Sequence, residues 1–137
     1  MATSPEYFEH GADIGVIGRG ASLEEAFAQA AAAMFAIMVE PQTVQPAAEV
    51  EIEFDEDDIE LALVRWLNAL LAQAREQRLA LCRFELQRRG EHWHGRARGE
   101  PWRDAHARGT EVKGATLTSL SVRQDEHGCE ARCVVDV

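Results

Sequence analysis

The sequence predicts an α+β fold, in which two amphipathic helices pack on one face of a mixed, mostly antiparallel sheet. Three observations support this class. Two segments carry apolar side chains at the spacing of a helix that is buried on one side. Other segments alternate apolar and charged residues, as half-buried strands do. The last predicted strands follow one another through short turns, which is typical of antiparallel pairing.

Both helices are predicted from their starts and their apolar stripes. Ser22 and Glu25 have the spacing of a capping box, and Asp57 and Glu60 repeat that spacing ahead of the second helix. The first stripe holds apolar residues at helical spacing: Phe27, Ala30, Ala31, Met34, Phe35 and Met38. The second stripe has the same character: Leu63, Val64, Leu67, Leu70, Leu71 and Ala74.

Strands are expected between and after these helices. The segments that read as strands are 7–8, 14–16, 50–54, 79–88, 92–98, 112–116, 119–123 and 129–137, so that order is expected up to the last residue, Val137. A change in the alternation near Arg83 predicts a β-bulge. Gly90 and residues 126–128 predict turns, and residues 103–110 predict a loop.

Length and composition indicate one domain over residues 1–137. The chain is 46% hydrophobic, and no apolar run reaches the ~18 residues that a membrane span requires. Residues 1–5 lack the features of a signal peptide, so we expect a soluble, cytoplasmic protein. Its three cysteines are an odd number without a C-x-x-C motif, and we expect them to be reduced and to act as small apolar side chains.

The formal net charge of −10 argues against a protein that binds nucleic acid by itself, because Lys and Arg contacts to phosphate supply most of that affinity. Residues 49–60 contain eight acids and no base, whereas residues 83–108 contain seven arginines and four acids. Both runs are typical of solvated surface. Alternatively, they give the molecule an acidic side and a basic side for docking on a charged partner.

Two motifs with possible chemistry have simpler interpretations. His92 and His94 lie on one face of a predicted strand and could share a metal, but no third ligand is evident, which favours surface histidines. The glycines of residues 15–20 lack the spacing of a dinucleotide-binding loop and are interpreted as turn residues.

Polar residues near the two ends of the chain are the remaining candidates. Asp13 follows His10 in a predicted loop, where a carboxylate acts as a cap or as a metal ligand. Asp136 and the α-carboxylate of Val137 place two anionic oxygen groups side by side, and Ca²⁺ or Mg²⁺ prefers such groups. Lys113, the only lysine, shares a strand face with Glu111, which is typical of an exposed charge pair.

Taken together, several segments resemble the archease family over nearly the whole chain. They are residues 7–15 (YFEHGADIG), 22–27 (SLEEAF), 64–71 (VRWLNALL), 109–116 (GTEVKGAT) and 135–137 (VDV). The resemblance lies in their order and spacing rather than in any single segment. Two departures are His10-Gly-Ala-Asp13, where the family usually has Thr in second place, and the absence of Tyr-His after Thr116.

This resemblance implies an accessory protein rather than an enzyme. Archeases activate the tRNA-splicing RNA ligase RtcB by promoting its guanylylation and multiple turnover. The implied metal ligands are Asp13, Asp136 and Val137, the ion is expected to be calcium or another divalent metal, and His10 and Lys113 match further functional positions. The implied partner is an RtcB-type ligase, through which the protein would meet GTP and tRNA indirectly.

Two other functions are compatible with the same residues. One is a general chaperone or protein-binding module, which would need no metal. The other is a small metal-dependent hydrolase that uses Asp13, Asp136 and His10, which would require a pocket and a free position on the metal.

Overall fold

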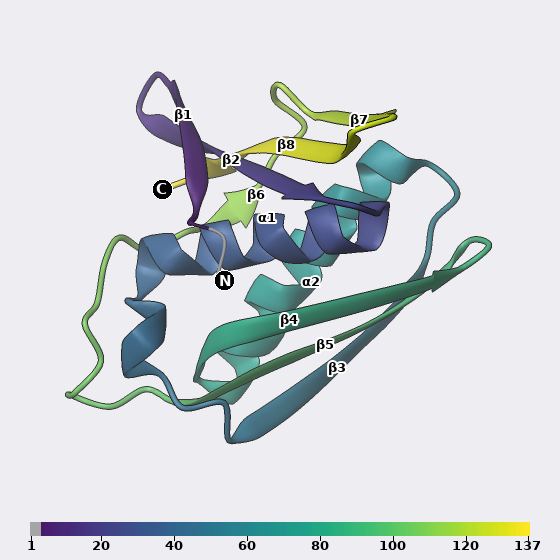
Figure 1. Cartoon of the computed structure of the whole chain (residues 1–137). Coiled ribbons are helices and arrows are strands. Elements are labelled where there is room, and N and C mark those ends of the chain that lie inside the picture. The colour runs from purple at the N-terminus through teal and green to yellow at the C-terminus, as the bar shows by residue number, and fades with distance from the viewer. Residues whose placement is uncertain (1–3) are drawn as a thin grey trace.

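The strands are divided between two antiparallel sheets, and helix α1 (Leu23–Met38) lies between them (Figure 1). This computed structural model describes residues 4–137. One sheet has the order β1-β2-β8-β6, and β7 also pairs with β8. Its strands are β1 (Glu6–His10), β2 (Asp13–Gly20), β6 (Gly114–Ala115), β7 (Ser121–Asp125) and β8 (Gly128–Asp136).

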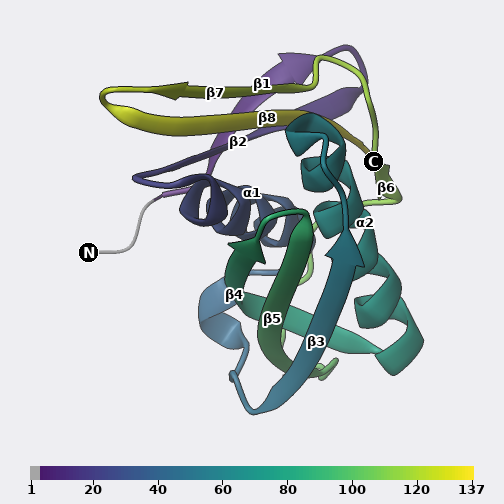
Figure 2. The same cartoon turned by 90° about the vertical axis from the view of Figure 1, so that its right-hand side faces the viewer.

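The second sheet has three strands in the order β3-β5-β4. They are β3 (Ala48–Asp55), β4 (Leu79–Arg89) and β5 (His92–Pro101). Helix α2 (Ile59–Gln77) contacts strands of both sheets (Figure 2), and a short 3-10 helix, η1 (Pro41–Thr43), follows α1. The predicted α+β class and the antiparallel pairing are confirmed.

The arrangement of the layers differs from the prediction of one sheet covered on one face. Ala26 and Ala30 of α1 face β2, whereas Phe27 stacks on Trp93 of β5, with ring centroids 5.3 Å apart. Phe35 packs on Phe84 of β4 at 5.2 Å. Because apolar side chains leave α1 on opposite sides, the helix is covered by a sheet on each side.

The predicted starts of the helices are close to those observed. Ser22 is the N-cap of α1, and its hydroxyl accepts a hydrogen bond from the Glu25 N–H, as expected. The N-cap of α2 is Asp58 rather than Asp57, because the Asp58 carboxylate accepts from the Leu61 N–H at 3.0 Å. The prediction for the second helix was therefore one residue too early.

The glycines of residues 15–20 lie inside strand β2 and not in a turn, so that interpretation was wrong. A Cβ on Gly15 would come within 2.2 Å of the Phe8 ring. A Cβ on Gly18 would come within 2.0 Å of the Ala26 carbonyl oxygen. These glycines allow β2 to lie directly against Phe8 of β1 and against α1. Asp13 is the first residue of β2, so this packing also fixes its position.

Several local predictions are confirmed, and one is only partly so. The register of β4 against β5 shifts between Leu81 and Arg83, where the bulge was expected. Gly90 turns the chain with a φ of +59°. All three cysteines are free, and Cys129 and Cys133 are buried. Of the strand expected over 112–116, only Gly114–Ala115 pairs as a strand.

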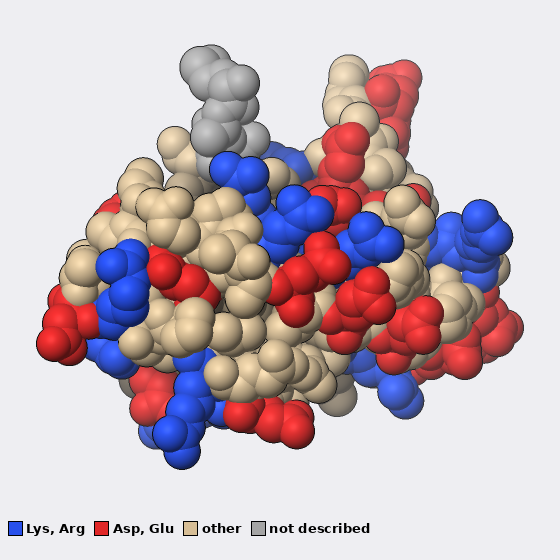
Figure 3. All heavy atoms as spheres, turned by 90° about the horizontal axis from the view of Figure 1, so that it is seen from below, with Lys and Arg blue, Asp and Glu red and all other residues tan. Residues whose placement is uncertain are grey.

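The acidic and basic runs do not form separate sides of the molecule. They occupy adjacent strands of the second sheet, so that acids and arginines alternate on one face (Figure 3). Glu49 lies 3.2 Å from Arg98, and Glu51 lies 3.6 Å from Arg96. We call these cross-strand pairs of acids with arginines and histidines on β3 and β5 the charged ladder. Each exposed pair contributes about 0–1 kcal/mol to the free energy of unfolding, so the charged ladder affects the local charge balance more than the stability of the fold.

Within residues 4–137, neither helix is long and apolar enough to cross a membrane.

Replacing Gly18 with Ala tests the close approach of β2 to α1. The added Cβ would meet the backbone of Ala26, which cannot move without shifting the helix. We expect the free energy of unfolding, measured by urea denaturation, to fall by about 1–3 kcal/mol. Gly114→Ala is the control, since its Cβ would lie 3.5 Å from the nearest side-chain atom. Equal stability of the two variants would contradict this packing.

Candidate functional site

The β1–β2 hairpin and the C-terminus of the chain meet at one end of the five-stranded sheet. Strands β2 and β8 pair antiparallel with Ile14 opposite Val135, so Asp13 and Asp136 are the next residues on the two strands. The Val137 N–H donates a hydrogen bond to Asp13 Oδ1 at 3.4 Å. Both views of the fold place the C-terminus at this end of the sheet and close to β6 (Figures 1 and 2).

Asp13 and Asp136 share the outer face of this sheet, away from α1. Side chains alternate between the two faces of a strand, so Asp13 is on the same face as Arg19, and Asp136 is on the same face as Glu130. Arg19 and Glu130 form an ion pair of 2.6 Å on that face. The fold therefore brings both carboxylates to one solvent-exposed surface.

His10 lies beside Asp13 because β1 and β2 form a hairpin. The two residues are register partners, and Gly11-Ala12 is the two-residue turn between them. Gly11 has a φ of +61°, which glycine adopts without strain. Glycine in the second place of the His-x-x-Asp segment is therefore suited to this turn, and His10 remains exposed.

Lys113 reaches the same end of the sheet from the loop before β6. Its N–H donates to the Asp136 carbonyl oxygen at 2.8 Å, and Gly114 pairs with Asp136. The expected pair of Lys113 with Glu111 is not formed, and within residues 4–137 the Lys113 ammonium has no ion-pair partner. We refer to His10, Asp13, Lys113, Asp136 and Val137 as the sheet-end site.

Two residues of α2 hold the Lys113 segment in place. The Arg75 guanidinium donates to the carbonyl oxygens of Val112 and Lys113, at 2.6 and 2.7 Å. The Asn68 side chain both accepts from the Ala115 N–H, at 2.8 Å, and donates to the Ala115 carbonyl, at 3.2 Å. The amide thus pairs with β6 as a neighbouring strand would.

Neither Asn68 nor Arg75 was predicted from the sequence to have a role in the site. The available signal was Asn68 itself, since asparagine is a weak helix former and here lies within an otherwise favourable helical segment. Its partner Ala115 is 47 residues away in sequence, so periodicity could not identify the contact.

The donor atoms of the sheet-end site suit a hard cation. Asp13, Asp136 and the main-chain carboxylate of Val137 offer only oxygen atoms, which Ca²⁺ and Mg²⁺ prefer. Among residues 4–137 there is no group of three or more His, Cys, Asp or Glu side chains that could hold a metal. A metal at this end of the sheet would therefore need a main-chain oxygen in addition to the two aspartates.

His92 and His94 engage carboxylates instead of approaching a common metal. His92 Nδ1 lies 2.8 Å from Asp55 Oδ1, and this hydrogen bond raises the pKa of the exposed imidazole. His94 Nε2 lies 4.0 Å from Glu51. Both histidines belong to the charged ladder on the outer face of the second sheet, in keeping with their interpretation as surface residues.

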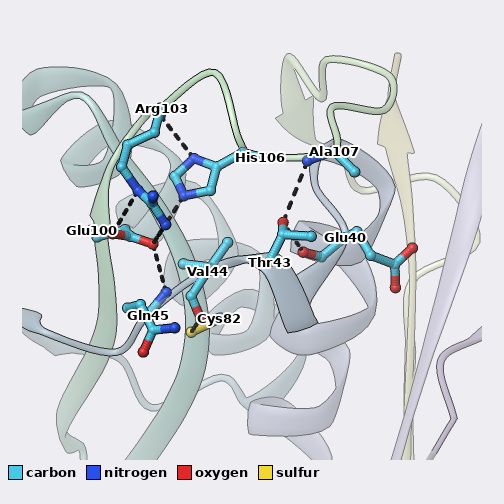
Figure 4. Close-up of polar contacts among 9 residues, drawn as sticks. All are labelled: Glu40, Thr43, Val44, Gln45, Cys82, Glu100, Arg103, His106 and Ala107. Atoms are coloured by element: carbon cyan, nitrogen blue, oxygen red, sulfur yellow. Dashed lines mark hydrogen bonds and ion pairs between the residues drawn. The ribbon is translucent and has the colours of Figure 1, made fainter.

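A second polar cluster closes the loop that follows β5 (Figure 4). Glu100 Oε2 accepts hydrogen bonds from the Gln45 N–H at 2.7 Å, from Arg103 Nη2 at 3.0 Å and from His106 Nε2 at 3.0 Å. His106 Nδ1 accepts from the Arg103 N–H at 2.9 Å, so the imidazole is clamped on both nitrogens. The hydrogen bonds from Arg103, His106 and Gln45 lower the pKa of Glu100 to about 2.

The fold and this site define a class of small α+β protein in which an oxygen-donor cluster forms where the first hairpin meets the C-terminal strand. The family model described as "Archease protein family (MTH1598/TM1083)" matches residues 6–137, and the chain belongs to the archease family.

Curated relatives and a solved structure agree with this assignment. Protein archease of Sulfolobus acidocaldarius is 36% identical over 96% of this chain and 97% of its own length. Protein archease of Methanosarcina mazei is 32% identical over 96% and 94%. The solution structure of Methanobacterium thermoautotrophicum protein 1598 superposes with a TM-score of 0.81 at 29% identity, covering 97% of this chain and 98% of that one.

The Glu100 cluster predicts a specific response to acid. The folded-state pKa is depressed, so the stabilisation is complete above the unfolded value of about 4.5 and is lost as the pH falls toward about 2. Glu100→Gln removes the titrating group. Its free energy of unfolding should therefore be lower than that of the wild type at pH 6, and this difference should shrink between pH 4.5 and 2. Urea denaturation at a series of pH values measures this, and a difference independent of pH would contradict it.

Proposed function

We propose that this protein activates an RtcB-type RNA ligase by promoting guanylylation of the ligase and its multiple turnover, in tRNA splicing or RNA repair. The proposal rests on membership of the archease family, whose relatives are named protein archease and not as enzymes. The observation that carries it is the contact of Val137 with Asp13, at 3.4 Å, which joins the C-terminal residue to the β1–β2 hairpin in one acidic site.

In this proposal Asp13, Asp136 and Val137 hold a divalent metal, with Ca²⁺ the leading candidate. The cation would supply positive charge beside the phosphate groups of GTP on the ligase. The Val137 N–H fixes one Asp13 oxygen, and the pairing of Lys113 and Gly114 with Asp136 fixes the end of β8. Because the paired strand ends hold the two aspartates in place, their carboxylates would already be oriented toward an ion before it binds.

Lys113 and His10 flank the aspartates and would meet the ligase or its nucleotide. Lys113 is exposed, and the Arg75 clamp on its carbonyl directs the backbone but leaves the ammonium accessible. The protein would bind the GTP-accepting state of the ligase more tightly than the other states, since a partner shifts an equilibrium only through such a difference. It would act in the cytoplasm and would carry no ligation chemistry itself.

Substitution of either aspartate tests the proposed metal site. Asp13→Asn and Asp136→Asn keep the side-chain shape but remove a charge, and we expect each to weaken Ca²⁺ binding by about tenfold or more in isothermal titration calorimetry. Asp57→Asn is the matched control, because it removes an exposed charge from the acidic run beside α2. A short extension after Val137 converts its carboxylate to an amide and should weaken binding too.

Unchanged Ca²⁺ affinity in both aspartate variants would reject this metal site. Retained affinity in the extended chain alone would show that the negative charge of the Val137 carboxylate is not needed for binding.

Activation is tested by ligation with the RtcB-type ligase of the same organism. We expect the protein to accelerate formation of the ligase–guanylate intermediate from GTP and to permit many turnovers per ligase. Lys113→Met should reduce this acceleration and leave Ca²⁺ affinity within about twofold, because it removes a charge beside the carboxylates but no donor oxygen.

An unchanged rate of guanylylation would refute the proposal. Release of phosphate from nucleotides by the protein alone would favour the metal-dependent hydrolase instead. Metal-independent protection of unrelated proteins from aggregation would favour a general chaperone.

A further inference from the structure

A cavity of about 520 Å³ lies at the opposite end of α2 from its N-cap. It is bounded by the C-terminal parts of α1 and α2 and by residues 102–112, which we call the strap. This volume falls within the range of about 300–1,000 Å³ that is typical of small-molecule sites.

The floor of the cavity is apolar. It is formed by Phe35 and Met38 of α1, Leu71 of α2, Leu79 of β4 and Val112 of the strap. Phe35, Leu71, Leu79 and Val112 belong to the main core, so the floor is held by the packing of the whole molecule. A ligand with an apolar body would be removed from water here.

Arginines surround this floor, although the chain carries a net charge of −10. Arg75, Arg78 and Arg108 line the cavity, against a single acid, Glu111. Among the ion pairs of residues 4–137, which involve six other arginines, none includes these three. Their charge is therefore not neutralised by a carboxylate of the described chain.

The three arginines are not equally available to a ligand. Arg75 already donates to the carbonyl oxygens of Val112 and Lys113. Arg108 lies over the Trp102 ring, 4.2 Å from its centroid, and this stacking leaves the edges of the guanidinium open to an acceptor. Arg78 is exposed at the C-cap of α2. Arg78 and Arg108 are the groups that an anion would meet.

The strap is anchored by hydrogen bonds within the chain itself, so the fold alone shapes the cavity. The N–H groups of Gly109 and Thr110 donate to the carbonyl oxygens of Met38 and Ile37, at 2.8 and 2.9 Å. A Cβ on Gly109 would lie 2.1 Å from the Ile37 oxygen, so this approach requires glycine. At the other end, the clamp of His106 on Glu100 fixes the start of the strap (Figure 4).

We propose that this cavity is a binding site for a small amphipathic anion, with an apolar or aromatic body on the floor and a carboxylate, sulfonate or phosphate at Arg78 and Arg108. The apolar floor selects the body of the ligand, and the unpaired guanidinium groups select its charge. Neither the apolar floor nor the arginines require a metal or the ligase. Failure of the proposed function would therefore not refute this site, and failure of this site would not refute the proposed function.

Binding of 1-anilinonaphthalene-8-sulfonate to the full chain tests this proposal, because this dye combines an aromatic body with one sulfonate. Fluorescence titration of the native protein should show one saturable site. Arg78→Gln combined with Arg108→Gln should weaken binding by about tenfold or more. The matched control combines Arg89→Gln with Arg123→Gln, which removes the same charge from exposed strands, and should change the affinity by less than about twofold.

A second variant tests the floor independently of charge. Ala74 lines the cavity from α2, and Ala74→Phe fills part of its volume, so we expect the saturable binding to be lost. Circular dichroism and the thermal midpoint show whether this variant is folded; if it is not, the arginine pair alone decides. Decanoate should displace the dye, whereas inorganic phosphate at the same concentration should not.

Dye affinity that is equal in the wild type and in the Arg78/Arg108 variant would overturn the site. Displacement of the dye by inorganic phosphate as effectively as by decanoate would overturn the role of the apolar floor.

Discussion

The burial of α1 between two sheets is the constraint on which the rest of this structure depends. One side of the helix presents alanines, and β2 approaches it so closely that Gly18 has no room for a side chain. The other side presents Phe27 and Phe35 to the second sheet. Burial of each large apolar side chain contributes about 1.5–3 kcal/mol to the free energy of unfolding. The side chains of α1 therefore stabilise the packing of both sheets. A shift of α1 would move β2, and with it Asp13.

The sheet-end site exists only because distant parts of the chain pair. Asp13 and Val137 are 124 residues apart, and their contact depends on the whole register between β2 and β8. The unfolded chain would hold these carboxylates far apart and could not bind one ion with both. Metal affinity at this site would therefore be coupled to folding, and bound metal would raise the free energy of unfolding in proportion to the logarithm of its concentration.

Local features were predictable from the sequence because their signals are local. The cap at Ser22, the bulge near Arg83 and the turn at Gly90 each depend on a few neighbouring residues. The division into two sheets was not predictable, since periodicity shows that a face is buried but not what covers it. The candidate site could be predicted only from the resemblance, for the same reason. Alternation placed Asp136 on the polar face of its strand, but it could not show which strand lies beside it. That neighbour is β2, and the register of β8 against β2 brings Asp136 to Asp13. The supporting contacts of Asn68 left almost no sequence signal.

Arg75 connects the proposed ligand cavity to the sheet-end site. Its guanidinium lines the apolar cavity and also holds the carbonyl oxygens of Val112 and Lys113. The next contact along the chain joins the Lys113 N–H to Asp136. A ligand that drew Arg75 toward the cavity would loosen the segment that carries Lys113, and a partner that fixed Lys113 would restrain Arg75. Because coupling between two sites is reciprocal, any effect of a cavity ligand on the sheet-end site must be matched by an equal effect in the other direction.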